Sequence, residues 1–357
     1  MEGSSTLACL IAAGGTAGHV RPALAVAEAL RARGVTVTFA GSRGNVESRL
    51  VPDAGFELDT FAISGFPRRV DVELVRALAR AVRAPFACSE ILSRRRPDVV
   101  LGAGGYVAGP MVLAARLRGV PTALTEADAH LGLANRLAAP FARRLFLAYA
   151  IPGREDGKCR VVGRPIPLAH LGATRDEGRA HFGLPLDRPV LAVFGGLAGA
   201  QALNELAVET YGTAGPAVLH ISGERDYGAL RPRVTRPDYV LVASTDAFGK
   251  ALAAADLALS RAGGTVWELA AAGTPAILVP YPYATADHQT LNARHFADGG
   301  GAVVVDQRDL ERVPDLVAEL LEDPARLERM SASMRVLAKP AAADEIADEL
   351  IRLAEGR

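Results

Sequence analysis

The sequence of 357 residues contains little cysteine and no long apolar run, and each shortage excludes a class of protein. Cys9, Cys88 and Cys159 are its cysteines, and none forms a C-x-x-C pair, so no disulfide framework is expected and a reducing cytoplasm fits best. No stretch approaches the roughly 20 apolar residues of a membrane-spanning helix. The first residues also lack the basic segment and long apolar segment of an export signal, so we expect neither a span nor export.

Apolar residues are plentiful, at 50%, beside 22% charged residues and 36 glycines. A chain of this composition can bury large cores, and its length suits two domains. The formal net charge is zero, but residues 1–165 contain 22 Lys and Arg against 14 Asp and Glu, whereas residues 166–357 contain 18 against 26. A basic first half suggests contact with phosphates, an anionic bilayer or nucleic acid, although such an imbalance can also be plain solvation.

Short β-rich runs alternate with segments of helical periodicity, which is typical of parallel strands joined by helices. We predict two doubly wound, Rossmann-like α/β domains over residues 1–163 and 164–338, facing a cleft, and a final helix over residues 339–357 that packs back toward the first domain. A polar, proline-rich connector covers residues 163–189. The predicted strands cover residues 7–12, 35–40, 59–63, 99–101, 121–125 and 144–147 in the first half, and 190–194, 217–222, 239–243, 257–260, 276–279 and 302–305 in the second.

Glycine-rich loops follow two predicted strands of the first half, at residues 13–19 and 102–110. The first precedes a helix expected to begin near Pro22. Small residues expose backbone N–H groups beside a helix N-terminus, so the pair of loops predicts a ligand with a diphosphate, unless the glycines only permit close packing. The spacing is not G-x-G-x-x-G, and no acidic residue ends the second strand, which disfavours a dinucleotide dehydrogenase.

Three side chains near these loops are candidates for proton transfer. His19 ends the first loop and is our first choice as general base. The alternative is that His19 is a structural residue at the start of the helix, where it caps the helix backbone. Glu126 and Asp128 follow the fifth strand, where α/β folds place active-site carboxylates, and Asp128 is the second choice. Either carboxylate could instead be solvated or cap the next helix.

The second half contains a strand–glycine–helix junction at residues 260–268. Glu268, about one turn into the helix, can accept both hydroxyls of a ribose. Arg261 and the helix N-terminus at Gly263, Gly264 and Thr265 can face the diphosphate of the same nucleotide. Another helix opens with His288, Gln289 and Asn292, whose side chains suit sugar hydroxyls, although a capped surface helix is the alternative.

No metal site is predicted, because the sequence lacks H-E-x-x-H, a cysteine cluster and a well-placed D-x-D pair. A membrane surface is predicted within residues 66–96, where Arg76, Arg80 and Arg83 share one helical face. The alternative is an ordinary surface helix. Nucleic acid is disfavoured, since only 5% of residues are aromatic. The apolar face of this helix holds Leu74, Val75, Leu78 and Val82, and the basic patch extends to Arg68, Arg69, Arg94, Arg95 and Arg96.

These segments together resemble the MurG family, glycosyltransferases of the GT-B fold. The resemblance spans nearly the whole chain. It implies an inverting transfer of N-acetylglucosamine from UDP-N-acetylglucosamine to the undecaprenyl-diphosphate-linked lipid I, giving lipid II in peptidoglycan synthesis. It also implies a peripheral protein on the cytoplasmic face of the cell membrane, with no cofactor beyond the co-substrate and with cell-wall synthesis proteins as possible partners. The matching segments are 14–22, 64–66, 102–110, 132–135, 195–196 and 261–268, with Gln289 and Asn292.

The resemblance assigns the acceptor to the basic half and the donor to the acidic half. Four motifs depart from the family pattern. Residues 125–128 read TEAD rather than HEQN, residues 163–167 read GRPIP rather than GNPVR, and residues 195–199 read GGLAG rather than GGSQG. The junction at residues 261–268 is one residue shorter than in the family. A transferase for another lipid or natural product, an epimerase of similar fold, and an inert UDP-sugar- or lipid-binding paralogue remain alternatives. The implied donor contacts further include Thr16, Ala17, Gly18, Asp128, Arg164 and Leu197, and the implied acceptor contacts are Gly14, Gly15, Gly104, Gly105, Tyr106 and Asn135.

Overall fold

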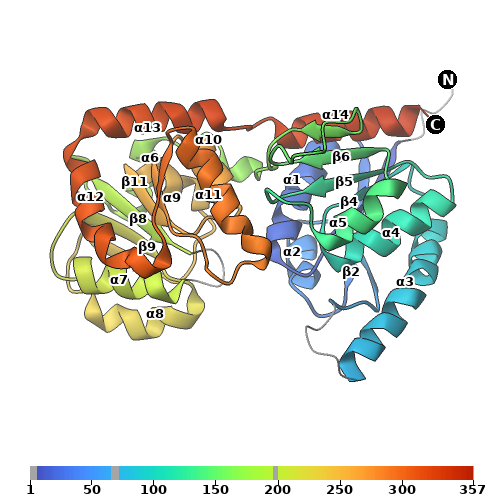
Figure 1. Ribbon diagram of the computed structural model, residues 1–357, viewed down its shortest axis with the longest axis horizontal. Coiled ribbons are helices and arrows are strands. Elements are labelled where there is room, and N and C mark those ends of the chain that lie inside the picture. The colour runs from blue at the N-terminus through green and yellow to red at the C-terminus, as the bar shows by residue number, and fades with distance from the viewer. Residues whose placement is uncertain (1–5, 66–71, 196–199, 357) are drawn as a thin grey trace. The chain divides into compact units, whose positions relative to one another are not determined.

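The computed structural model describes residues 6–65, 72–195 and 200–356, and the chain divides into two compact units (Figure 1). The first unit comprises Met1–Pro167 with Pro340–Arg357, and the second comprises Leu168–Lys339. The first junction lies four residues beyond the one expected from the sequence. Arg164 and Ile166 stay with the first unit because their side chains are buried there.

Over its described residues, the first unit contains a seven-stranded parallel sheet in the order β3-β2-β1-β4-β5-β6-β7. Alternate residues of β1 serve opposite faces, as the period of a strand requires. Ile11 packs in the cluster of α1, α2 and α14, whereas Leu10 packs in that of α3 and α4. The strands are β1 (Ala8–Ala12), β2 (Thr36–Ser42), β3 (Glu57–Phe61), β4 (Val99–Gly102), β5 (Thr122–Glu126), β6 (Arg144–Leu147) and β7 (Cys159–Val161); the helices are α1 (Ala17–Ala32), α2 (Glu47–Asp53), α3 (Val72–Arg95), α4 (Gly105–Leu117), α5 (Leu133–Ala138), the 3₁₀ turn η1 (Ala139–Phe141) and α14 (Ala342–Glu355).

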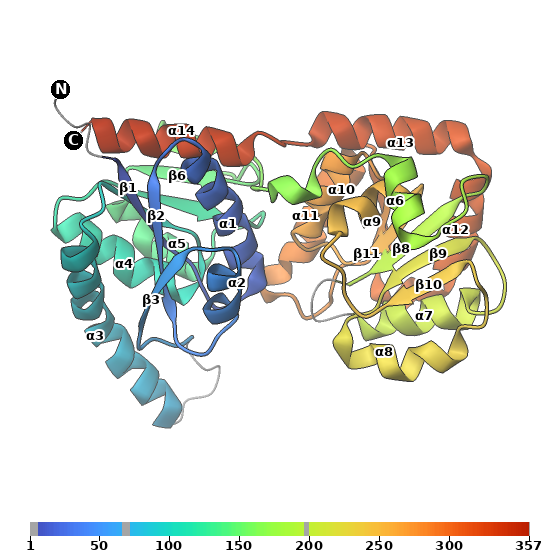
Figure 2. The ribbon, with the colours of Figure 1, turned by 180° about the vertical axis from the view of Figure 1, so that it is seen from behind.

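The last helix, α14, packs beside α1 in the first unit (Figure 2). Ile346 and Leu350 are fully buried in the same cluster as Leu30 of α1. Arg33 forms ion pairs with two aspartates of α14, the closer of them Asp348 at 2.8 Å. The chain therefore returns to its first unit to cover one face of the sheet.

The second unit repeats the architecture. Its described part contains a six-stranded parallel sheet in the order β10-β9-β8-β11-β12-β13. Its strands are β8 (Val190–Phe194), β9 (Ala217–Ile221), β10 (Tyr239–Val242), β11 (Leu257–Ser260), β12 (Ala276–Leu278) and β13 (Ala302–Val304); its helices are α6 (Arg175–Phe182), α7 (Gln201–Tyr211), α8 (Glu224–Leu230), α9 (Phe248–Ala254), α10 (Thr265–Ala272), α11 (His288–Asp298), α12 (Val313–Glu322) and α13 (Pro324–Leu337), with 3₁₀ turns η2 (Leu168–His170), η3 (Arg231–Arg233), η4 (Thr285–Asp287) and η5 (Gln307–Arg312).

The two Rossmann-like parallel-sheet domains predicted from the sequence are confirmed, and each predicted strand lies within two residues of an observed one. The short edge strand β7 was not predicted. No helix was predicted in the connector, but it contains α6, which Thr174 and Glu177 open with a capping box and Gly183 ends in the left-handed conformation. The T-x-x-E signature of that helix was present in the sequence.

The start of α1 also corrects the prediction, because the helix begins at Ala17 rather than near Pro22. Proline lacks the N–H that a helix interior uses, so it normally favours the first turn. Here the carbonyl oxygen of Gly18, which Pro22 cannot engage, accepts a hydrogen bond of 2.6 Å from Nη2 of Arg164. A distant guanidinium thus allows the helix to extend past the proline.

Candidate active site

The glycine-rich loop after β1 lies directly against the one after β4. A Cβ at Gly104 would lie 2.6 Å from Cδ2 of His19, and a Cβ at Gly105 would lie 2.4 Å from the carbonyl oxygen of Gly14. Both Gly104 and Gly105 have positive φ, at 90° and 72°. The structure therefore brings the two predicted loops into contact, and only glycine permits this approach.

A buried carboxylate supports the first loop. Oε2 of Glu47 accepts the N–H of Gly15 at 3.1 Å, and Oε1 accepts the N–H of Ser42 at 3.0 Å. Glu47 is fully buried at the start of α2. The predicted acceptor-binding role of Gly15 cannot rest on this N–H, because a protein carboxylate already accepts it.

Tyr106 covers the same loop from α4. A Cβ at Gly15 would lie 3.0 Å from Cε1 of its ring, and one at Gly65 would lie 3.4 Å from Cδ1. The hydroxyl of Tyr106 accepts a hydrogen bond of 3.1 Å from Nδ2 of Asn45. The ring is thus fixed beside Gly15, and its role in acceptor binding stays a prediction.

His19 lies in the first turn of α1, behind the N-cap residue Thr16, and Ala17 and Gly18 open the helix. Its Nδ1 lies 3.2 Å from Oγ1 of Thr16. Burial lowers the pKa of His19 below its ordinary value, and the positive charge of Arg164 lowers it further. Asp128, a hydrogen bond to the Gly14 backbone and Glu47 act in the opposite direction but do not cancel the decrease. A neutral imidazole can accept a proton, as a general base must.

Glu126 holds the loop that follows β5. Its side chain is buried and accepts hydrogen bonds of 2.9 Å from the N–H groups of Ala127 and Gly132 and from Nδ2 of Asn135. Burial raises the pKa of Glu126, and the hydrogen bonds from Gly132 and Asn135 oppose the rise. The amide nitrogen of Asn135 also donates to the carbonyl oxygen of Thr125 at 2.9 Å. Both side chains thus shape the loop, and substrate contact by Asn135 stays a prediction.

Asp128 lies half-buried in that loop, close enough to His19 to raise its pKa. The two candidate bases therefore lie near one another at one edge of the sheet. Arg164, predicted to contact the donor, is buried and connects the two loops, since it donates to Gly18 at 2.6 Å and to the carbonyl oxygen of Ala127 at 3.3 Å.

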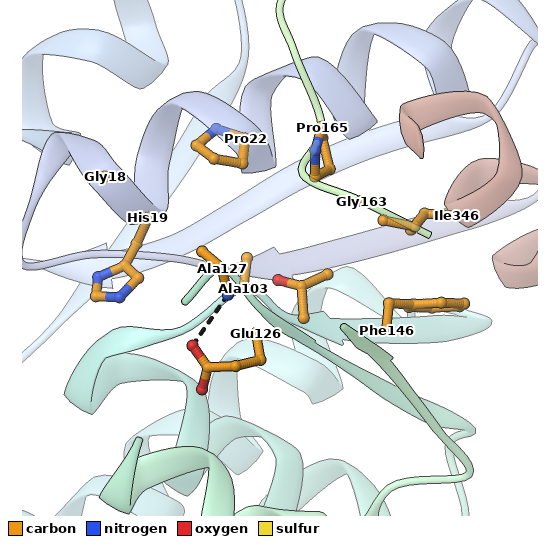
Figure 3. Close-up of a pocket in the computed structure, with 11 residues that line it drawn as sticks. Gly18, His19, Pro22, Ala103, Glu126, Ala127, Phe146, Gly163, Pro165 and Ile346 are labelled. Atoms are coloured by element: carbon orange, nitrogen blue, oxygen red, sulfur yellow. Dashed lines mark hydrogen bonds between the residues drawn. The ribbon is translucent and has the colours of Figure 1, made fainter. Parts of the chain in front are cut away.

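A small cavity lies within the first unit, between the start of α1 and the loop that follows β5. Figure 3 shows His19 and the Glu126–Ala127 hydrogen bond at its wall. Pro22, Phe146 and Ile346 of α14 also line it. Its volume is about 10 Å³, the smallest space that admits one water molecule. It cannot hold a sugar ring.

In the second unit, the predicted nucleotide junction lies between β11 and α10. Gly264 is the N-cap residue and contributes no side-chain cap, so the half-buried residues Gly263, Gly264 and Thr265 present the backbone of a helix N-terminus. Glu268 follows in the first turn, and its Oε1 lies 2.6 Å from Nδ1 of His170.

The guanidinium of Arg261 is buried beneath this junction. Nη1 donates to the carbonyl oxygens of Val279 and Pro280 at 3.2 Å, and Nη2 donates to Oε1 of Gln307 at 2.5 Å. Burial lowers the pKa of Arg261. Direct phosphate contact by Arg261 stays a prediction, because these described bonds all point into the protein.

Two polar residues of α11 reach back to the same edge of the sheet. Asn292 is fully buried and donates to the carbonyl oxygen of Ala262 at 3.3 Å, while Oε1 of Gln289 accepts the N–H of Tyr281 at 2.9 Å. His288, half-buried, opens the helix. The bond from Asn292 to Ala262 therefore joins the predicted nucleotide and sugar motifs.

Helix α3 carries the predicted membrane surface. Arg76 and Arg83 are exposed, and Arg80 donates to Oγ of Ser64 at 3.1 Å. Val82 and Phe86 are 71% and 77% exposed. The predicted extension of the basic patch at the helix end needs correction, because Arg94 and Arg95 form ion pairs with Asp59 and Glu57.

Several predicted residues lie outside the described ones: Arg68, Arg69 and Leu197, and the side chains of Leu74, Val75 and Leu78. Among the described residues, no group of three His, Cys, Asp or Glu side chains could hold a metal ion. No helix in the described parts of the chain is long and apolar enough to cross a membrane. That the reaction needs no metal stays a prediction.

Models of known protein families match the sequences of both units. A model of the glycosyltransferase family 28 N-terminal domain matches residues 9–147, and one of the family's C-terminal domain matches residues 190–348. The matches and the two parallel-sheet units define the class of the protein as a family 28 glycosyltransferase.

Individual relatives narrow the class. A Halothermothrix orenii protein is 36% identical over 96% of this chain and 98% of its own, and one from Mycobacterium sp. strain KMS is 44% identical over 92% and 91%. Both are named UDP-N-acetylglucosamine–N-acetylmuramyl-(pentapeptide) pyrophosphoryl-undecaprenol N-acetylglucosamine transferase. The crystal structure of Acinetobacter baumannii MurG is 28% identical, with a TM-score of 0.78 over 97% of this chain and 99% of its own. The chain belongs to the MurG family, which confirms the resemblance seen in its motifs.

Sequence reasoning missed two residues that support the site, Glu47 and His170. Each is a single polar residue outside any motif. Glu47 lies 32 residues from its partner Gly15, and His170 lies 98 residues from Glu268. No local pattern in the sequence reports either pairing.

Proposed function

We propose that the protein transfers N-acetylglucosamine from UDP-N-acetylglucosamine to the N-acetylmuramyl-(pentapeptide) group of an undecaprenyl-diphosphate lipid, which forms lipid II for peptidoglycan. The observation that carries this conclusion is the 44% identity to a relative named for that activity, over 92% of the chain. The match extends through both units, so it includes both predicted binding regions.

In the proposed reaction, the acceptor hydroxyl attacks the anomeric carbon of the sugar from the side opposite UDP. The new carbon–oxygen bond forms as the bond to the UDP oxygen breaks, and its electron pair leaves with UDP, so the configuration inverts. His19 accepts the hydroxyl proton. The lowered pKa of His19 supports this role, since the imidazole is neutral near pH 7. Asp128 is the alternative base.

The second unit binds the donor in this proposal. Glu268 accepts the two ribose hydroxyls, and the N-terminus of α10 at residues 263–265 stabilises the charge that develops on the diphosphate. His288 and Gln289 contact the sugar. Arg261 acts through its charge, because its guanidinium is bonded to protein oxygens. The reaction needs no cofactor or metal ion.

The acceptor lipid implies work at a membrane. We place the protein as a peripheral protein on the cytoplasmic face, attached through α3. Phe86 and Val82 are exposed apolar side chains beside the exposed Arg83, the combination that suits the headgroup zone of an anionic bilayer. Proteins of cell-wall synthesis are further proposed partners.

The test is UDP release from UDP-N-acetylglucosamine by the purified protein, with and without a short-chain lipid I analogue. We expect acceptor-dependent release that Glu268→Ala greatly reduces and that Glu311→Ala, an exposed glutamate of the same unit, retains. UDP binding without turnover would indicate an inert paralogue. Free epimerised sugar without acceptor would indicate an epimerase, and release only with a different acceptor would reject lipid I as the substrate.

A further inference from the structure

The carboxylate of Glu268 is held by a histidine from the segment that enters the second unit. Oε1 of Glu268 lies 2.6 Å from Nδ1 of His170, at the end of η2. Both side chains are largely buried, at 12% and 11% exposure. Within the part of the chain that the structure describes, this is the hydrogen bond found for the Glu268 carboxylate. A carboxylate has about four acceptor positions, so most of its capacity is left for a ligand.

His170 is itself fixed by the start of α9. Its ring meets the ring of Phe248 edge to face, with centroids 5.5 Å apart, and Phe248 meets Phe194 of β8 in the same way. A Cβ at Gly249 would lie 2.7 Å from Cα of His170, so the absence of a side chain there lets the η2 backbone lie against α9. The imidazole is therefore anchored to the central sheet through packing.

We propose that His170 is a positioning residue for nucleotide binding: its ring N–H holds one oxygen of Glu268, which turns the remaining acceptor positions of the carboxylate toward the 2′ and 3′ hydroxyls of the uridine ribose. The inference rests on the ribose-binding role proposed for Glu268. Holding the carboxylate in one rotamer before binding reduces the entropy lost when the nucleotide binds. A buried carboxylate that has one hydrogen-bond donor is stabilised further when two ribose hydroxyls donate to it. This favours binding of a ribonucleotide over binding of a nucleotide that lacks the 2′ and 3′ hydroxyls.

A purely structural role would have another consequence. If His170 only fastened η2 to the second unit, its loss would weaken the fold and reduce binding of all nucleotides alike. A positioning role acts on the hydroxyls alone. The discriminating quantity is therefore the ratio of the dissociation constants of 2′,3′-dideoxy-UDP and UDP, which does not depend on the fraction of protein that is folded.

The experiment measures both constants by calorimetry on the full chain, for the wild type and for His170→Ala, His170→Asn and Glu268→Ala. We expect His170→Ala to weaken UDP binding by about tenfold, the equivalent of one hydrogen bond to a charged group, and to leave dideoxy-UDP nearly unchanged. Asparagine can donate from a position near that of Nδ1, so His170→Asn should recover much of the ratio. His181→Ala, at an exposed histidine of the same unit, is the matched control.

Steady-state kinetics give a second readout. His170→Ala should raise KM for UDP-N-acetylglucosamine by a similar factor and leave kcat within about twofold, because the ribose is remote from the reacting carbon. The double variant with Glu268→Ala should bind UDP no more weakly than Glu268→Ala alone, since the two residues act as one unit.

The outcomes separate this inference from the proposed function. If the wild type binds UDP and dideoxy-UDP equally, Glu268 does not recognise the diol, and both the ribose role and the inference fail. If the wild type prefers UDP and only Glu268→Ala removes the preference, the proposed function stands and the positioning role of His170 is rejected. If His170→Ala weakens the binding of UDP and of dideoxy-UDP by the same factor, the positioning role of His170 is also rejected.

Discussion

Nη2 of Arg164 donates a hydrogen bond of 2.6 Å to the carbonyl oxygen of Gly18, four residues before Pro22. Pro22 has no N–H, so this oxygen lacks the donor that the residue four positions on normally supplies in an α-helix. Arg164 also bonds to Ala127 in the loop after β5. One guanidinium thus completes the helix that carries His19 and ties it to the loop that carries Asp128.

Removing this guanidinium should loosen the start of α1. We expect Arg164→Met to destabilise that region by about 1–3 kcal/mol, because two partly buried carbonyl oxygens lose a charged donor. Pro22→Ala restores the missing N–H, so in the Pro22→Ala background the cost of Arg164→Met should be smaller. Hydrogen exchange of the α1 peptide measures both. An equal cost in the two backgrounds would show that the bond to Gly18 contributes little.

The contact between the two glycine-rich loops predicts that alanine substitutions at two nearby glycines affect stability and activity very differently. Gly104→Ala places a Cβ 2.6 Å from the His19 ring at a φ of +90°, so we expect a loss of about 1–3 kcal/mol and reduced UDP release in the transferase assay. Gly109→Ala, within α4, is the control, because a Cβ there meets no described atom within 4 Å apart from the backbone of its own helix. Thermal unfolding and UDP release check both variants. Equal behaviour of the two would contradict the close packing of Gly104 on His19.

The buried His220 predicts acid sensitivity of the second unit. Its Nε2 lies 2.9 Å from Oδ1 of Asn204 and its Nδ1 lies 2.8 Å from the hydroxyl of Tyr239. Burial lowers the pKa of His220 to about 4, whereas an unfolded histidine titrates near pH 6.5. Below about pH 6.5 the unfolded chain binds a proton that the folded chain does not. The stabilisation is therefore complete above pH 6.5 and is lost as the pH falls toward 4.

The difference between these pKa values corresponds to at most about 3 kcal/mol. Fluorescence of Trp267, the single tryptophan, reports urea unfolding of the second unit. We expect the wild type to lose stability between pH 7 and pH 5 more steeply than His220→Gln. Parallel pH profiles for the two proteins would refute the assignment.

The exposed side chains of α3 predict membrane attachment. Phe86→Ser should reduce binding to anionic vesicles, whereas Val336→Ser, which removes a similarly exposed apolar residue from α13, should not. Arg83→Gln should weaken binding most at low salt, by roughly 1 kcal/mol, since screening suppresses the contribution of a basic side chain. Vesicle co-sedimentation at two salt concentrations measures these effects. Unchanged binding in both α3 variants would place the membrane surface elsewhere.

Much of the candidate site was predictable where its residues form one local motif. The loops at residues 14–19, 102–105 and 261–268 follow their strands as expected, because parallel sheets place such loops at the carboxyl edge. The orientation of individual groups was not predictable. The Gly15 N–H and the Arg261 guanidinium looked available for phosphate, yet each is bonded to a protein oxygen.

The sequence by itself determined the two parallel-sheet units, the order of their strands along the chain and the family, because periodicity and glycine spacing are local properties. Only the tertiary structure decided the pairings Glu47 with Gly15, His170 with Glu268 and Arg164 with Gly18, across 32, 98 and 146 residues. Such pairings depend on which side chains the folded sheets bring within hydrogen-bond distance. A single sequence carries no periodic signal for these three pairings. Each is one polar contact between two segments that lie far apart in the sequence and come together only when the chain folds.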